Sequence, residues 1–244
     1  YEMQRSLVGS EMCIRDRAKI AAFRLRSPVF RIFVPRNRFA QMKFPTLPIR
    51  LWTAFAAALV SAGCARPAFE ASWRQTLDNA DGGLLRVWSI ADRSDSLFLR
   101  RRAEPVTARM YAAEEFGRLC EGLLTTVRNP QNEGVGIAAP QVGIGLRVIA
   151  VQRFDLPGEP FGVYVNPEIV RRTGPAVPGP EGCLSIPDRY GDVARPQQIE
   201  IRYRDSRFIR RREVIRGYTA VIFQHEVDHL DGILFIDRMA AERP

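Results

Sequence analysis

Residues 218–232 read YTAVIFQHEVDHLDG, and they carry the strongest local signal in the 244-residue chain. The stretch predicts a helix from about Tyr218 to Leu230, because the Asp-Gly pair that follows suits a helix C-terminus. It also holds the two histidines of the whole sequence, His225 and His229. Residues four apart share one face of a helix, so both imidazoles can reach one point in space.

Glu226 lies between the two histidines and completes an HExxH pattern. Such a pattern supplies two nitrogen ligands for a divalent metal, with a carboxylate beside them to take the proton of a metal-bound water. The alternative is that two helical histidines meet by chance. The absence of any other histidine, and a glutamate at the required place, disfavour that alternative.

A tetrahedral metal that keeps one open position needs a third protein ligand. A downstream Asp or Glu and an upstream Cys are the candidates. Cys183 lies in GPEGCLSIP (179–187). Free cysteines are commonly small buried apolar residues, which suits Cys120 on an apolar helix stripe better than Cys183 between Gly182 and Leu184. Thiolate ligation would favour Fe(II) or Zn(II).

A third segment, GVGIAAPQVGIG (134–145), is rich in Gly and Ala, which let the backbone approach a ligand closely. It lacks the GK[ST] ending of a phosphate-binding loop and any dinucleotide fingerprint. Taken alone, such a segment is more often a turn than a binding site.

Taken together and in this order, GVGIAAPQ (134–141), EGCLS (181–185) and HEVDH (225–229) resemble the three signature motifs of the peptide deformylases. The resemblance extends from about Leu84 to Met239. It implies a hydrolase that removes the formyl group from N-formyl-methionyl nascent polypeptides and releases formate.

The resemblance also implies the metal site. Cys183, His225 and His229 would hold one divalent ion, natively Fe(II), with Zn(II), Ni(II) or Co(II) as substitutes. Glu226 would be the general acid and base that activates the metal-bound water. Asp228 either orients an imidazole or is solvated.

The remaining roles concern the substrate. By the resemblance, Gln141 and the backbone N–H of Leu184 would bind the oxyanion, and Gly136 would lie along the substrate channel. Glu181 and Arg195 are candidates for an ion pair near the site. We expect apolar walls for the methionine side chain from Val135, Tyr218, Val221 and Ile222. Ordinary core packing would explain these four residues equally well.

Two other functions compete with this hypothesis. An HExxH zinc endopeptidase would need a third ligand downstream of His229, where Asp231 and Asp237 are the nearby candidates. A catalytically inactive deformylase-like binding module is disfavoured, because all the metal and acid–base positions are filled.

The rest of the pattern predicts an α+β fold. An amphipathic helix is expected over 107–127, followed by strands at 146–152, 162–170 and 199–205 and one through Ile215. This order predicts small mixed or antiparallel β-sheets packed around a central metal-binding helix, preceded by an N-terminal extension of low order.

The chain is predicted to divide near residue 84. Residues 1–41 show no sustained period and are interpreted as an artefact or disordered leader, with Met42 as the biological start. Residues 42–64 resemble a secretory or lipoprotein signal, or a targeting segment. Residues 65–83 are predicted to be a linker, and 84–244 to be the catalytic domain.

Composition excludes several classes. An apolar content of 46% suits a folded core and excludes collagen and wholesale disorder, while no apolar run reaches the roughly 18 residues of a membrane span. Residues 1–83 hold 13 basic and 6 acidic side chains, whereas 84–244 hold 23 and 21. The folded part is therefore nearly balanced, and we expect no specific nucleic-acid partner.

The expected partners are formyl-methionyl nascent peptides and, transiently, the ribosome, although the chain lacks the long C-terminal helix that many bacterial deformylases carry. We expect a monomer. The implied substrate favours the cytoplasm, a mitochondrion or a plastid, whereas the segment at 42–64 favours export or import, and the sequence leaves both open.

Overall fold

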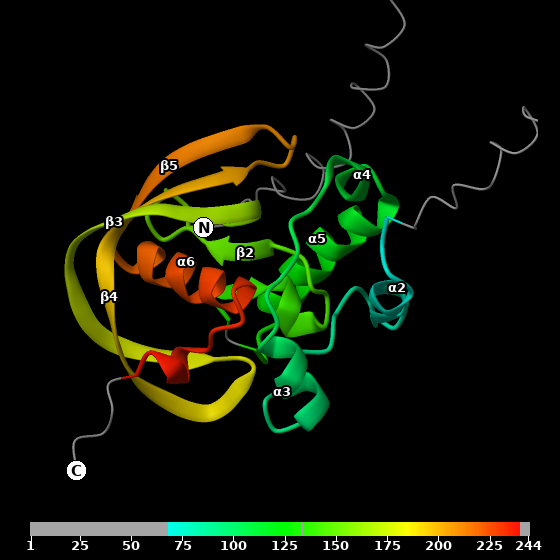
Figure 1. Cartoon of the computed structure of the whole chain (residues 1–244), viewed down its shortest axis with the longest axis horizontal. Helices are drawn as coiled ribbons and strands as arrows, with labels where there is room; N and C mark the ends of the chain where they lie inside the picture. The colour runs from blue at the N-terminus through cyan, green and yellow to red at the C-terminus, as the bar shows by residue number, and fades with distance from the viewer. Residues whose placement is uncertain (1–67, 133, 240–244) are drawn as a thin grey trace, which may run out of the picture. The chain divides into compact units, whose positions relative to one another are not determined.

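The computed structural model describes residues 68–132 and 134–239, so the predictions for 1–41 and 42–64 lie outside the described residues. None of the described helices combines the length and the apolar character that crossing a membrane requires. In chain order, the elements are α2 (Ala71–Asp78), α3 (Arg93–Leu99), α4 (Ala108–Tyr111), α5 (Glu114–Val127), β1 (Gly136–Ala138), η3 (Ala139–Val142), β2 (Val148–Gln152), β3 (Phe161–Cys183), β4 (Ile186–Arg204), β5 (Arg210–Arg216), α6 (Gly217–Leu230) and η4 (Phe235–Asp237) (Figure 1).

The strands of the described residues form one antiparallel sheet in the order β1-β2-β3-β4-β5. The α+β class is confirmed, but the prediction of several small sheets is wrong. Strands β3 and β4 are much longer than the runs predicted at 162–170 and 199–205. Their outer halves contain Gly and Pro, which have low strand propensity, so the sequence pattern showed only the inner halves.

The long β3–β4 ribbon is bent as well as twisted. Its pairing register shifts at four places, including one between Glu181 and Cys183. Each shift leaves residues unpaired, one on β3 at the first three places and three on β4 at the last, and such bulges bend the strand. In Figure 1 the ribbon curves around α6, and its turn, at Leu184 and Ser185, brings the end of β3 back to that helix.

Helix α6 contacts all five strands. It lies where the sequence predicted it, and most of its residues are buried. Its apolar side chains, such as Phe223 and Val227, pack with Ile149 and Ile201 of the sheet. Several polar residues on the helix are buried too, among them Gln224, Glu226, Asp228 and His229, and burying a polar group is costly unless it finds a partner.

The glycine predicted beyond the end of α6 is confirmed. Gly232 has a φ of 75°, and its N–H donates to the carbonyl of His229 at 3.2 Å, while Ile233 N–H donates to the carbonyl of Asp228 at 2.9 Å. This is the Schellman arrangement, which favours glycine at this place. A Cβ here would also lie only 2.4 Å from the carbonyl oxygen of Arg100.

A second core lies between α5, α2 and the sheet. The helix predicted over 107–127 is present as α4 and α5. Leu119 and Leu123 of α5 are fully buried there.

The linker predicted at 65–83 is wrong for the part that the structure describes. Phe69, Trp73 and Leu77 are at most 5% exposed and join the α5 core. Trp73 and Leu77 are four residues apart and share one face of α2, and Phe69 lies just before the helix begins. Because the residues between them are polar or small, the sequence analysis did not detect this four-residue apolar period.

We therefore expect Leu77→Ala to lower the free energy of unfolding by about 2–5 kcal/mol, because it leaves a cavity in the core. Urea denaturation followed by circular dichroism measures this. The matched control is Gln75→Ala on the exposed face of α2, which should change stability by less than about 0.5 kcal/mol. Equal, small effects from both would contradict a packed α2.

Candidate metal and catalytic site

Helix α6 and the end of β3 bring three ligand-type side chains together. The Sγ of Cys183 lies 3.2 Å from Nε2 of His229, and the ring centres of His225 and His229 are 5.0 Å apart. One donor atom from each of the three residues lies within 4.8 Å of the others. The four-residue spacing on the helix aligns the imidazoles, as the sequence predicted, while only the folded β3–β4 ribbon brings the sulfur to them.

These separations fit a single ion. Bond lengths of about 2.3 Å to sulfur and 2.0–2.1 Å to nitrogen place neighbouring donors of a tetrahedral ion roughly 3.5 Å apart. A thiolate with two imidazoles is the donor set of a borderline ion such as Fe(II) or Zn(II). The residues present therefore fit the divalent metal that the sequence motifs imply.

Glu181 supports one of the imidazoles. Its Oε2 lies 2.9 Å from Nδ1 of His225, so the opposite ring nitrogen is directed toward the ligand cluster. Arg195 donates to both oxygens of the same carboxylate, at 2.5 and 3.0 Å. The ion pair suggested by the sequence is therefore present, and it fixes the ring through a buried carboxylate. Glu181 and Cys183 are two residues apart on β3, so their side chains lie on the same face of the strand.

The charges around the ligands favour a cation. Burial alone would lower the pKa of His225, but contacts with Cys183 and Glu181 raise it to about 10. Burial would raise the pKa of Glu181, yet His225 and Arg195 hold it below its ordinary value. Burial and the charge of His225 keep the pKa of His229 well below its ordinary value.

Glu226 points into the same space. Its side chain is 3% exposed, and its Oε2 has no hydrogen-bond partner among the described residues. Burial raises the pKa of this carboxyl to about 7, which suits a group that both accepts and returns protons near neutral pH. A buried oxygen without a partner is costly, so it marks a place that a water or substrate group fills.

Gln141 reaches the cluster from η3. Its Oε1 accepts from the backbone N–H of Ala138 at 2.8 Å, which turns its Nε2 toward Cys183 Sγ at 3.6 Å and Ser185 Oγ at 3.3 Å. The amide is thus held with its donor toward the site. Leu184, at the β3–β4 turn, lies at the same cavity.

A cavity of about 610 Å³ joins these groups. All five substrate-contact candidates line it, namely Val135, Gly136, Tyr218, Val221 and Ile222. Tyr218 stands at the rim, with 55% of its surface exposed, and its ring packs on Phe154. The sequence analysis missed the contribution of Asp188, Arg189 and Tyr190, which line the cavity from β4. The sequence feature that could have indicated these three residues is that they follow the EGCLS motif within a few positions.

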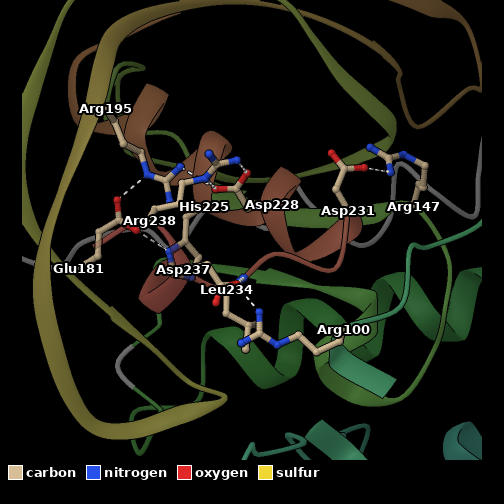
Figure 2. A network of polar contacts seen from close by, with 10 residues as sticks. All are labelled: Arg100, Arg147, Glu181, Arg195, His225, Asp228, Asp231, Leu234, Asp237 and Arg238. Carbon is tan, nitrogen blue, oxygen red and sulfur yellow. Dashed lines mark hydrogen bonds and ion pairs between the residues drawn. The ribbon is translucent and has the colours of Figure 1, made fainter. Parts of the chain in front are cut away.

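The ligands that an HExxH endopeptidase would need downstream lie elsewhere. Asp231 pairs with Arg147 at 2.7 Å, and Asp237 pairs with Arg100 (Figure 2). Neither carboxylate belongs to the ligand cluster found in the described residues. The third ligand candidate that the fold supports is therefore Cys183.

Comparison with known proteins gives a consistent result. Residues 87–244 match the family model of polypeptide deformylase. A peptide deformylase of Leptospira biflexa is 35% identical over 152 residues, which cover 59% of this chain and 84% of the relative. One from Heliobacterium modesticaldum is 40% identical over 168 residues, covering 66% and 99%.

Solved structures agree with the sequence relatives. The peptide deformylase of Thermotoga maritima is 34% identical, with a TM-score of 0.57, and the match covers 65% of this chain and 99% of that one. The enzyme of Synechococcus elongatus, solved in complex with actinonin, is 36% identical with a TM-score of 0.57, covering 65% and 82%.

The packing of Gly136 against Glu226 yields a prediction. A Cβ at this position would lie 2.5 Å from Glu226 Oε1 and 2.9 Å from Ile222 Cγ2. We expect Gly136→Ala to lower the free energy of unfolding by about 1–3 kcal/mol, because the site is overpacked. Urea denaturation measures the loss.

Two further variants identify the cause. Gly179→Ala is the control, since its Cβ would meet nothing within 4 Å. Adding Glu226→Asp to Gly136→Ala should recover part of the loss, because the shorter side chain withdraws the carboxylate. Additive losses in the double variant would show that the two residues do not contact each other.

Proposed function

The chain belongs to the polypeptide deformylase family, whose members are hydrolases of N-terminal formyl groups, and we propose that its catalytic centre is the cluster of Cys183, His225, His229 and Glu226. One observation carries this proposal. A sulfur and two imidazoles from segments about 40 residues apart meet within 4.8 Å, beside a buried carboxylate in the same cavity. An inactive binding module would have no need of that carboxylate.

Cys183, His225 and His229 would hold one divalent ion. The thiolate suits Fe(II) and Zn(II) alike, and the family resemblance favours Fe(II), with Zn(II), Ni(II) or Co(II) as substitutes. When bound, such an ion lowers the pKa of a coordinated water toward about 7 and polarises a carbonyl oxygen. Every other part of the reaction is assigned to side chains and backbone of this chain.

Glu226 moves the proton. Its carboxylate accepts a proton from the attacking water as the water oxygen bonds to the formyl carbon. The same carboxyl then donates the proton to the departing amine nitrogen, because an amide anion is too basic to leave unaided. The C–N bond breaks, and the products are formate and a peptide whose N-terminal methionine has a free amine. Its burial and its raised pKa support both roles.

Gln141 and Leu184 stabilise the negative charge that develops on the formyl oxygen. The Nε2 of Gln141 is directed at the cluster because its Oε1 is held by Ala138. The backbone N–H of Leu184 lies at the turn next to Cys183. A donor of this kind is worth roughly 3 kcal/mol of barrier.

The cavity accounts for a methionine substrate. Val135, Val221 and Ile222 form apolar walls beside the cluster, and Tyr218 closes the rim. Gly136 lets the substrate backbone pass close to Glu226, where a Cβ would intrude. An unbranched apolar side chain is the group that such a slot accommodates. The natural partner would thus be a formyl-methionyl nascent peptide. Ribosome contact, a monomeric state and the compartment remain predictions.

We expect Glu226→Gln to lose about 10² to 10⁴ in the rate of formate release from a formyl-Met peptide, because no proton acceptor remains. Its metal content should match that of the wild type. Formate is measured with Fe(II)-loaded protein under anaerobic conditions, and metal by elemental analysis. The control is the exposed Glu121→Gln on α5. Near wild-type turnover of Glu226→Gln would remove this residue from its role.

We expect Cys183→Ser to bind metal more weakly and to alter the preference among Fe(II), Zn(II) and Co(II), because a hydroxyl is a harder and poorer ligand. Chelator competition measures the affinities. Cys120→Ala removes the other cysteine of the described residues and should leave metal binding unchanged. Unchanged affinities in Cys183→Ser would exclude thiolate ligation.

A further inference from the structure

Arg238, which follows η4, reaches back to the metal-site helix (Figure 2). Its Nε donates to Oδ2 of Asp228 at 2.6 Å, and its Nη2 donates to Oδ1 at 2.6 Å. Both carboxylate oxygens thus receive a parallel N–H, which is the strong, orientation-specific form of an ion pair. Neither the sequence motifs nor the proposed mechanism assigns this arginine a role.

Asp228 continues a row of alternating charges toward the ligands. It also accepts from Nη1 of Arg195 at 2.8 Å. The same guanidinium donates to Glu181, and Glu181 in turn lies 2.9 Å from Nδ1 of His225. An unbroken series of hydrogen bonds therefore runs from Arg238 to one of the imidazoles.

The charge balance of this row depends on Arg238. Glu181 and Asp228 are 7% and 4% exposed, and both contact the same buried cation, Arg195. When His225 is neutral, as a metal ligand must be, one guanidinium neutralises one carboxylate, so the three buried residues alone carry an excess negative charge. Arg238 is the second cation, and it makes the four-residue row neutral. An uncompensated buried charge is strongly unfavourable.

We propose that Arg238 is a positioning residue of the metal site, which neutralises Asp228 and so leaves Arg195 free to hold Glu181 against His225. This inference rests on the proposed function, because it concerns the metal that the three ligands would hold. Without Arg238, both carboxylates compete for Arg195. Glu181 then loses its fixed position, and with it the hydrogen bond that selects the orientation of the His225 ring.

The backbone that carries Arg238 is itself fixed at the site. Leu234 and Phe235 are buried, with Cys183 packed against the same cluster, and the Phe235 ring stacks on His225 with centroids 6.1 Å apart. Asp237 accepts from the N–H of Leu234 at 2.8 Å. The guanidinium is therefore delivered to Asp228 from a defined position.

The test compares Arg238→Met with a matched control. Methionine keeps the length of the side chain but removes the charge. Arg118→Met is the control, because its side chain is 39% exposed against 40% for Arg238 and pairs with Asp78, away from the row. The Co(II) dissociation constant is measured by chelator competition. We expect a rise of about 10- to 100-fold for Arg238→Met and no change for the control.

A charge-rescue variant separates positioning from simple loss of packing. Arg238→Met combined with Asp228→Asn removes one positive and one negative charge, so the Arg195–Glu181 pair is again neutral. We expect the double variant to recover most of the Co(II) affinity. Loss of packing alone would make the double variant at least as weak as the single one.

A second readout needs no activity. The sequence has only two histidines, so nitrogen-15 labelling of histidine shows two imidazoles. In the Zn(II)-loaded wild type, the Nδ1 proton of His225 should be protected by Glu181. We expect Arg238→Met to weaken or abolish that signal, and Arg118→Met to leave it unchanged.

The outcomes are distinct. If Arg238→Met binds Co(II) as Arg118→Met does and keeps the His225 signal, the inference is overturned while the proposed function stands. If the wild type binds neither Co(II) nor Zn(II), both are overturned. Should Arg238→Met fail to fold, Arg238→Lys decides, because it keeps the charge but cannot make both contacts. A several-fold weaker affinity then supports the inference, and wild-type behaviour overturns it.

Discussion

The buried ion pairs among Glu181, Arg195 and Asp228 hold the proposed catalytic centre together, because each residue lies on a different element: β3, β4 and α6. A two-stranded ribbon alone is marginally stable in water. These hydrogen bonds attach the distal part of the ribbon to α6 at one register. A slip by one residue would turn Glu181 away from Arg195 and leave buried charges without partners. The sulfur of Cys183, two residues beyond Glu181, owes its position to the same attachment.

The ligands therefore come from two elements that are rigid for different reasons. Helix α6 is enclosed by the sheet and closed at its C-terminus by a Schellman motif, which fixes His225 and His229 relative to each other. Cys183 stands at the end of a strand, directly before a two-residue turn. Sites carried on regular elements are held more precisely than sites on loops. Glu226 then lies where the helix passes β1, and Gly136 of that strand leaves the room that its carboxylate occupies.

The folded unit extends beyond the segment that matches the family. That match begins at residue 87, whereas Phe69, Trp73 and Leu77 pack in the same core as α5. In addition, Arg74 of α2 pairs with Glu115 of α5 at 2.8 Å. Residues before the matched segment thus contribute buried surface to the core that supports η3, and hence to the placement of Gln141.

The sequence by itself determined the helix of the HExxH motif, its glycine end and the inner halves of the strands, because these depend on local periodicity and turn chemistry. Through the motif resemblance it also indicated Cys183, Gln141 and Glu226. Tertiary structure alone decided the full length of the ribbon, the packing of α2, and which cations meet Asp228. The chain has 36 Lys and Arg residues; the sequence indicated Arg195 only as a candidate partner of Glu181, and nothing local distinguishes Arg238 from the others. Only the folded backbone, which buries the carboxylates of Glu181 on β3 and Asp228 on α6, selects the arginines that must neutralise them.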